Sequence, residues 1–164
     1  MISRECDDGP VKRSSIRISL MLAVLSLLVV ASGAGAGERP FKGGGGGMLS
    51  LSPAQFQARG KVVHLGRCSL TVNLDQSSLD SGEIHPYLCS FTAASGDVLV
   101  ANVVSWSFDY ETGVLAATIS FRPMQDGRFD DATGNAKLLI VFDDWTDIFG
   151  NLSFTFAVQG TIDY

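Results

Sequence analysis

Apolar and polar residues alternate along most of the chain after Phe56, and this period of two constrains the fold more than any other feature. In the segment 68–74, every second residue from Cys68 onward is apolar, and the residues between them are polar. The last segment alternates in the same way from Leu152 to Tyr164. Because successive side chains of a strand point to opposite faces, these segments are typical of half-buried β-strands.

Turn-rich breaks divide the alternating segments into seven or eight predicted strands. One weak helical candidate, 52–58, begins with Ser52 and Pro53, which suit the start of a helix. The chain is therefore predicted to be all-β, as a single antiparallel β-barrel or, alternatively, a β-sandwich. We favour the barrel because the long final strand needs a partner on each edge, and closure leaves no edge exposed.

Residues 97–110 form another predicted strand, and its alternation selects one apolar face. That face contains Val104, Trp106 and Phe108, which we predict to point into the barrel interior. The opposite face, which begins at Leu99, is also partly apolar.

The first 36 residues have the composition of a secretory signal peptide. Four basic residues lie within 1–17, an apolar run follows at 18–31, and Ala34-Gly35-Ala36 resembles a cleavage site. The apolar run is shorter than the roughly 20 residues that cross a bilayer as a helix, and an uncleaved anchor is the alternative. We therefore predict a secreted protein, extracellular or periplasmic, with no stable membrane span after cleavage.

Residues 37–52 contain five consecutive glycines at 43–47 and are predicted to be a disordered linker. Residues 53–164 would then form the barrel domain. After cleavage, 8 basic and 14 acidic residues would remain, which gives a formal charge of −6. Because this charge repels phosphate backbones, we expect no nucleic acid partner.

Two cysteines, Cys68 and Cys89, follow the predicted cleavage point. An even number of cysteines in an exported chain favours a disulfide between them, with two free thiols as the alternative. A zinc site shared with His64 and His85 is less favoured. Residues i and i+4 of a strand lie roughly 13 Å apart, whereas zinc ligands lie about 2 Å from the metal. We expect no metal and no cofactor.

The segment 125–137, QDGRFDDATGNAK, is the most distinctive loop of the chain. Asp130, Asp131 and Asn135 could hold calcium, but their spacing does not match an EF-hand loop. We instead predict a structural corner, in which glycines supply positive φ angles and apolar side chains point inward. The corner residues are Gly127, Phe129, Ala132 and Gly134.

Four short motifs occur in a fixed order: HLGR at 64–67, FTAASGDVL at 91–99, GRFDDATG at 127–134 and GTIDY at 160–164. Together they resemble a group of uncharacterised secreted bacterial proteins with a GRFxxATG corner. The corner is also distantly similar to that of dirigent proteins and allene oxide cyclases. This resemblance implies a small antiparallel β-barrel. No set of positions matches the active sites of the cyclases or dirigent proteins, so the resemblance implies no chemistry.

The sequence contains no motif of a serine hydrolase, zinc protease or haem attachment site, and we assign no catalytic residue. The acids of 143–147, DDWTD, are interpreted as a solvated loop, because a glycosidase needs two carboxylates facing each other across a cleft. We predict a non-catalytic exported barrel that has a structural role or binds a small apolar ligand or a protein partner. The alternative is a cyclase-like or isomerase-like enzyme acting on an apolar substrate in the lumen.

Overall fold

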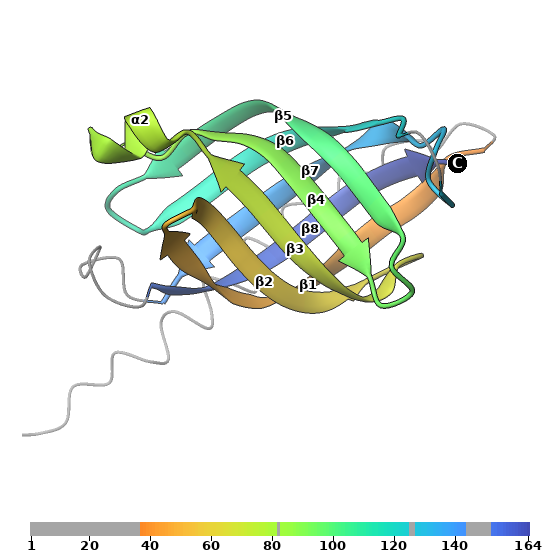
Figure 1. Ribbon diagram of the computed structural model, residues 1–164, viewed down its shortest axis with the longest axis horizontal. Helices are drawn as coiled ribbons and strands as arrows, with labels where there is room; N and C mark the ends of the chain where they lie inside the picture. The colour runs from red at the N-terminus through yellow and green to blue at the C-terminus, as the bar shows by residue number, and fades with distance from the viewer. Residues whose placement is uncertain (1–36, 82, 125–126, 144–151) are drawn as a thin grey trace, which may run out of the picture. The chain divides into compact units, whose positions relative to one another are not determined.

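The computed structural model describes residues 37–81, 83–124, 127–143 and 152–164, and eight strands in these residues form one closed barrel (Figure 1). The strands are β1 (Arg39–Leu51), β2 (Ala54–Val62), β3 (Gly66–Leu74), β4 (Pro86–Ala93), β5 (Val98–Asp109), β6 (Val114–Arg122), β7 (Thr133–Phe142) and β8 (Ser153–Asp163). Each strand pairs antiparallel with its neighbours in sequence, and β1 closes the barrel against β8. The predicted barrel is confirmed, and the β-sandwich alternative is excluded.

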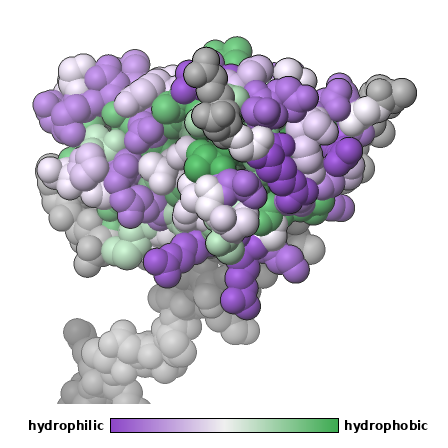
Figure 2. All heavy atoms as spheres, turned by 45° about the vertical axis from the view of Figure 1, so that its right-hand side comes forward, coloured by the Kyte–Doolittle hydropathy of each residue, from purple (hydrophilic) through white to green (hydrophobic). Residues whose placement is uncertain are grey.

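The alternating pattern of the sequence places one set of side chains inside the barrel and the other outside. In β3, the side chains of Cys68, Leu70 and Val72 are buried, while the intervening Ser69 and Thr71 are partly exposed. The same alternation of buried and more exposed side chains runs along β8. Hydrophilic side chains cover much of the surface in Figure 2, with smaller hydrophobic areas between them.

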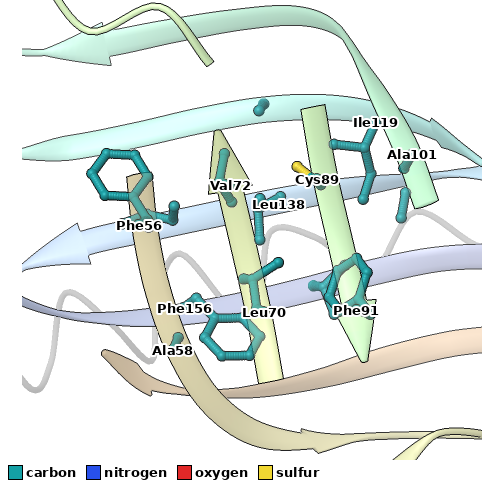
Figure 3. Close-up of a cluster of buried hydrophobic side chains, with 14 of the residues drawn as sticks. Phe56, Ala58, Leu70, Val72, Cys89, Phe91, Ala101, Ile119, Leu138 and Phe156 are labelled. Atoms are coloured by element: carbon teal, nitrogen blue, oxygen red, sulfur yellow. The ribbon is translucent and has the colours of Figure 1, made fainter. Parts of the chain in front are cut away.

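The barrel interior is filled by aromatic and aliphatic side chains. The ring of Phe41 packs edge-on against Phe91 and Phe121, with centroids 5.4 Å and 4.8 Å away. A second aromatic group surrounds Phe56, whose ring lies 5.5 Å from that of Phe154. Figure 3 shows side chains from β2, β3 and β4 meeting in this interior. Among the described residues, no polar or charged residue is buried.

The glycine run is part of the barrel, so the prediction of a disordered linker at 37–52 is wrong. Gly43–Gly47 lie within β1 and pair with β2 on one side and β8 on the other. Gly45 shares the inward phase of Phe41, and a Cβ on it would collide with the Arg59 carbonyl and lie 2.6 Å from the Gly60 Cα. Only glycine permits so close an approach of two backbones, and β1 is a full strand of the barrel.

The helical candidate at 52–58 is also wrong. Ser52 and Pro53 form the turn between β1 and β2, and β2 begins directly afterwards at Ala54. The alternation of buried Ala54, Phe56 and Ala58 is that of a strand. The short helix α2 (Gln76–Asp80) lies after β3 instead, where the Asp75 carboxylate caps it by accepting from the Ser77 backbone N–H at 3.0 Å.

A β-bulge in β5 changes the predicted phase of that strand. The pairing of β5 with β6 shifts register between Val103 and Ser105, which makes Val104 the extra residue of the bulge. Val104 is therefore 65% exposed, and its predicted place in the interior is wrong. Trp106 and Phe108 are partly buried and pack against the core. Because the bulge adds one residue, they lie on the same side of the sheet as Leu99, whereas Val104 does not.

Candidate functional site

The topology brings the four sequence motifs to one end of the barrel, which we call the motif end. HLGR spans the β2–β3 turn, FTAASGDVL the β4–β5 turn, GRFDDATG the β6–β7 connection, and GTIDY finishes β8. Since neighbouring strands are antiparallel, alternate connections lie at the same end, together with the start of β1 and the end of β8. The motif end is at the right of Figure 1, where the C-terminus is marked.

The aspartate-rich segment forms a corner whose apolar residues point inward. Gly127 and Gly134 have φ angles of 135° and 124°, which favour glycine. The side chains of Phe129 and Ala132 are buried, and the Ala132 backbone N–H donates to the Phe129 carbonyl at 3.3 Å. The acidic side chains of Asp130 and Asp131 are exposed to solvent. Gln125 and Asp126, which begin the predicted segment, lie outside the described residues.

A group of aromatic and cationic side chains, which we call the tyrosine cluster, forms around Tyr164 at the motif end. Its members are Arg39, His64, Arg128, Phe129 and Tyr164. The Tyr164 ring packs edge-on against Phe129 with a centroid distance of 4.9 Å, and against His64 at 5.8 Å. Phe129 thereby links the buried core to the more exposed ring of Tyr164.

Two arginines approach the same Tyr164 ring. The guanidinium carbon of Arg39 lies 4.7 Å from the ring centre, and that of Arg128 lies 5.5 Å from it. An Arg128 nitrogen also donates a hydrogen bond to the Tyr164 hydroxyl at 3.2 Å. Cation–π contacts at exposed positions contribute about 0.5–1 kcal/mol each, which favours this placement of the two side chains.

His64 is held in an unusual backbone conformation within the cluster. Its φ of 73° is uncommon for a residue other than glycine, and its Nε2 lies 3.1 Å from the Pro40 carbonyl oxygen. The hydrogen bond joins the β2–β3 turn to β1. Because Arg39 directly precedes Pro40, the bond also fixes His64 relative to the backbone of Arg39. Strained backbone of this kind is often found at functional sites.

The predicted disulfide is absent, and both cysteines are free, buried thiols. Cys68 lies opposite Ala93 in the β3–β4 ladder, whereas Cys89 lies opposite Val72. The two cysteines are therefore offset by four residues, about 13 Å along the strands, while a disulfide needs Cα atoms about 4.4–6.8 Å apart. The disulfide prediction is wrong because it counted cysteines without knowing the register.

Burial makes both thiols poor nucleophiles. Desolvation raises the pKa of Cys89 to about 12. It also raises the pKa of Cys68, against a smaller lowering effect from a backbone hydrogen bond with Val62. Because the thiolate is the reactive form, neither cysteine is suited to covalent catalysis near neutral pH.

The remaining sequence candidates are not brought together. His85 lies before β4, near Glu83 at 3.1 Å and against the Trp106 ring at a centroid distance of 4.6 Å. Within the described ranges, no three His, Cys, Asp or Glu side chains are arranged to hold a metal ion. Most of the DDWTD loop, including Trp145, lies outside the described residues.

Sequence reasoning missed the contribution of Arg39 and Tyr164 to this site, because they belong to opposite ends of the described chain. The order of the four motifs was a usable signal, since three of them contain a member of the tyrosine cluster. The motifs alone gave no indication that their turns meet.

No protein-family model, no curated protein and no solved structure matches this chain. None of the helices in the part of the chain that the structure describes has the length and hydropathy of a membrane span.

Proposed function

We propose that this chain is an exported, non-catalytic β-barrel that binds a ligand or a protein partner at its motif end. The observation that carries the proposal is the separation between an apolar interior and an exposed end that collects arginine, histidine and tyrosine side chains. Such a barrel acts as a rigid support for the loops between its strands, which are the usual location of binding residues.

The lining of the interior supports binding outside the lumen. Aromatic rings and aliphatic side chains meet across the barrel, as in the contact between Phe41 and Phe121. A lumenal enzyme would need a group able to exchange protons or attack the substrate there. Cys89 is the inward-facing nucleophilic residue of β4, and its raised pKa keeps it protonated.

The proposal of export rests on the sequence of residues 1–36, with its basic start, apolar run and small residues near Ala36. It can be tested by expressing the full chain in a bacterium and measuring the mass of the protein in each compartment. We expect an exported form that begins near Gly37. Retention of the complete chain in the cytoplasmic fraction would contradict it.

The binding location is tested by nuclear magnetic resonance of the isotope-labelled protein. Benzene, a neutral probe that occupies empty apolar cavities, should leave the methyl signals of Leu70 and Ile119 unchanged, because the interior is filled. A panel of soluble sugars, carboxylates and peptides should give shifts that gather in the β2–β3 and β6–β7 turns. Saturable shifts of the interior methyl groups with an apolar compound would instead favour the alternative, a cyclase-like or isomerase-like enzyme with a lumenal site.

The family resemblance remains a proposal that agrees with this function. It rests on four motifs, and all four occur at the end that we assign to binding. A group of exported barrels that share this end would be expected to share the position of the binding site and not a catalytic mechanism.

A further inference from the structure

We propose that Arg39, Arg128 and Tyr164 bind an oxyanion, which is a carboxylate, sulfate or phosphate group of the ligand at the motif end. This inference rests on the proposed function and specifies the chemistry of the same site. It follows from the positions of two positive charges that share one aromatic ring.

Arg128 presents its guanidinium at the edge of the cluster. One nitrogen donates to the Tyr164 hydroxyl at 3.2 Å, and the guanidinium carbon lies 5.3 Å from the centre of the Phe129 ring. Because a guanidinium has five N–H donors, this arrangement uses only part of its capacity. The remaining N–H groups can bind an oxyanion through two parallel hydrogen bonds.

Arg39 adds a second positive charge beside the same ring. Neither Arg39 nor Arg128 forms an ion pair with any carboxylate among the described residues, where the one pair found is His85 with Glu83. Glu38 precedes Arg39 in the sequence and Asp130 follows Arg128 by two residues, but among the described residues neither carboxylate pairs with these arginines. The carboxylate of Asp163 lies beside Gly37, where a Cβ would lie 3.2 Å from it. The two arginines, which form no ion pair within the described ranges, therefore place two positive charges beside the Tyr164 ring.

The surrounding residues fix the geometry of this positive site. Tyr164 packs against the buried Phe129, and His64 is held by the Pro40 carbonyl. Arg39 begins β1 and Tyr164 directly follows β8, whereas His64 and Phe129 lie in connections between strands of the same closed barrel, so little rearrangement is needed on binding. A site with its donors already oriented loses less conformational entropy when the ligand arrives.

The ligand chemistry follows from the donors. Arginine binds planar or tetrahedral oxyanions through paired N–H groups, and the Tyr164 hydroxyl can donate a further hydrogen bond. A neutral ligand of the same shape lacks the charge that both guanidiniums require. Because both arginines are exposed, the affinity should fall as salt is added.

The test compares glucuronate with glucose, a pair of similar shape in which one member carries a carboxylate. Each is titrated into the isotope-labelled, full-length protein at low salt, and inorganic phosphate is added as a competitor. We expect glucuronate to shift the side-chain N–H signals of Arg39 and Arg128, glucose to leave them unchanged, and phosphate to shift the same signals and to raise the apparent Kd of glucuronate. Arg39→Gln and Arg128→Gln should each weaken glucuronate binding about tenfold or more.

Arg59→Gln is the matched control, because Arg59 is exposed on β2 away from the cluster and the substitution removes the same charge. It should leave the affinity unchanged. The amide spectrum of each variant reports whether the barrel remains folded.

The oxyanion assignment is overturned if glucuronate and phosphate leave the cluster unperturbed, or if Arg59→Gln weakens binding as much as Arg128→Gln. In either case the proposed function stands when a neutral ligand or a protein partner still shifts the turns of the motif end. Ligand shifts confined to the barrel interior would overturn the proposed function itself.

Discussion

Gly45 of β1 and Phe156 of β8 are direct partners across the seam that closes the barrel. Both residues are in the inward phase, and the buried side chain of Phe156 supplies apolar volume beside a strand that has no side chains at 43–47. On the other side, β2 approaches so closely that a Cβ at Gly45 would meet its backbone. The glycine run is thus a requirement of barrel closure.

The two phases of the glycine run should respond differently to alanine. Gly45→Ala places a methyl group against the Arg59 carbonyl and should lower the free energy of unfolding by about 1–3 kcal/mol. For Gly46→Ala, the nearest atom would be the Phe154 carbonyl oxygen at 3.4 Å, and the change should be small or stabilising by about 0.4–1 kcal/mol. Urea unfolding of both variants measures the difference. Equal tolerance of the two substitutions would contradict the close approach of β1 and β2.

The cysteines should behave as protected free thiols. Under native conditions at pH 8, iodoacetamide should leave Cys89 unmodified, because its side chain is buried and its raised pKa keeps the thiol protonated. In denaturant without reductant, both Cys68 and Cys89 should be alkylated, as peptide mass mapping would reveal. Recovery of a peptide pair linked through these two residues would disprove the observed register.

Ionisation of Cys89 should also contribute to unfolding at high pH. The pKa of Cys89 is raised in the folded state to about 12. The folded protein therefore binds this proton more tightly than the unfolded chain does. The resulting stability is fully present below the unfolded pKa, near 8.5, and is lost as the pH rises toward 12. Cys89→Ala should reduce the slope of stability against pH between about 9 and 12, and an unchanged slope would argue against a buried thiol.

Because of the bulge in β5, truncation to alanine should affect stability very differently at two aliphatic residues of this strand. Leu99→Ala removes a fully buried side chain and should cost about 2–5 kcal/mol of unfolding free energy. Val104→Ala affects an exposed bulge residue and should change it by no more than about 0.5 kcal/mol. Thermal or denaturant unfolding distinguishes the two variants. A large loss of unfolding free energy in Val104→Ala would indicate that Val104 is buried, as uninterrupted alternation predicts.

Much of the fold could be predicted from side-chain alternation, because strands such as β3 and β8 have one buried face and one exposed face. The glycine run could not be assigned in this way, since glycine has no side chain to alternate and its composition is typical of a flexible linker. The prediction that Val104 points inward is wrong because a bulge adds one residue to the strand, and the pattern of apolar and polar residues does not reveal that extra residue. Both failures concern positions where contact with a neighbouring strand decides the structure.

The candidate site was predictable only in its parts. Gly127 and Gly134 were identified as turn residues from their type, and Phe129 as an inward residue from the pattern of the corner. The meeting of Arg39, Arg128 and Tyr164 depends on the closure of β1 against β8, which is a long-range pairing. The disulfide prediction failed for the same reason, because the register of β3 and β4 separates Cys68 from Cys89.

Amide hydrogen exchange of the glycine run tests barrel closure most directly. In a closed barrel, the Gly44, Gly45 and Gly46 amides lie in a strand with a partner on each side, and we expect them to exchange slowly, with protection approaching that of Leu70 in β3. Exchange of these glycine amides at the rate of an unprotected peptide, while Leu70 remains protected, would contradict the closed barrel and the cluster that its closure assembles.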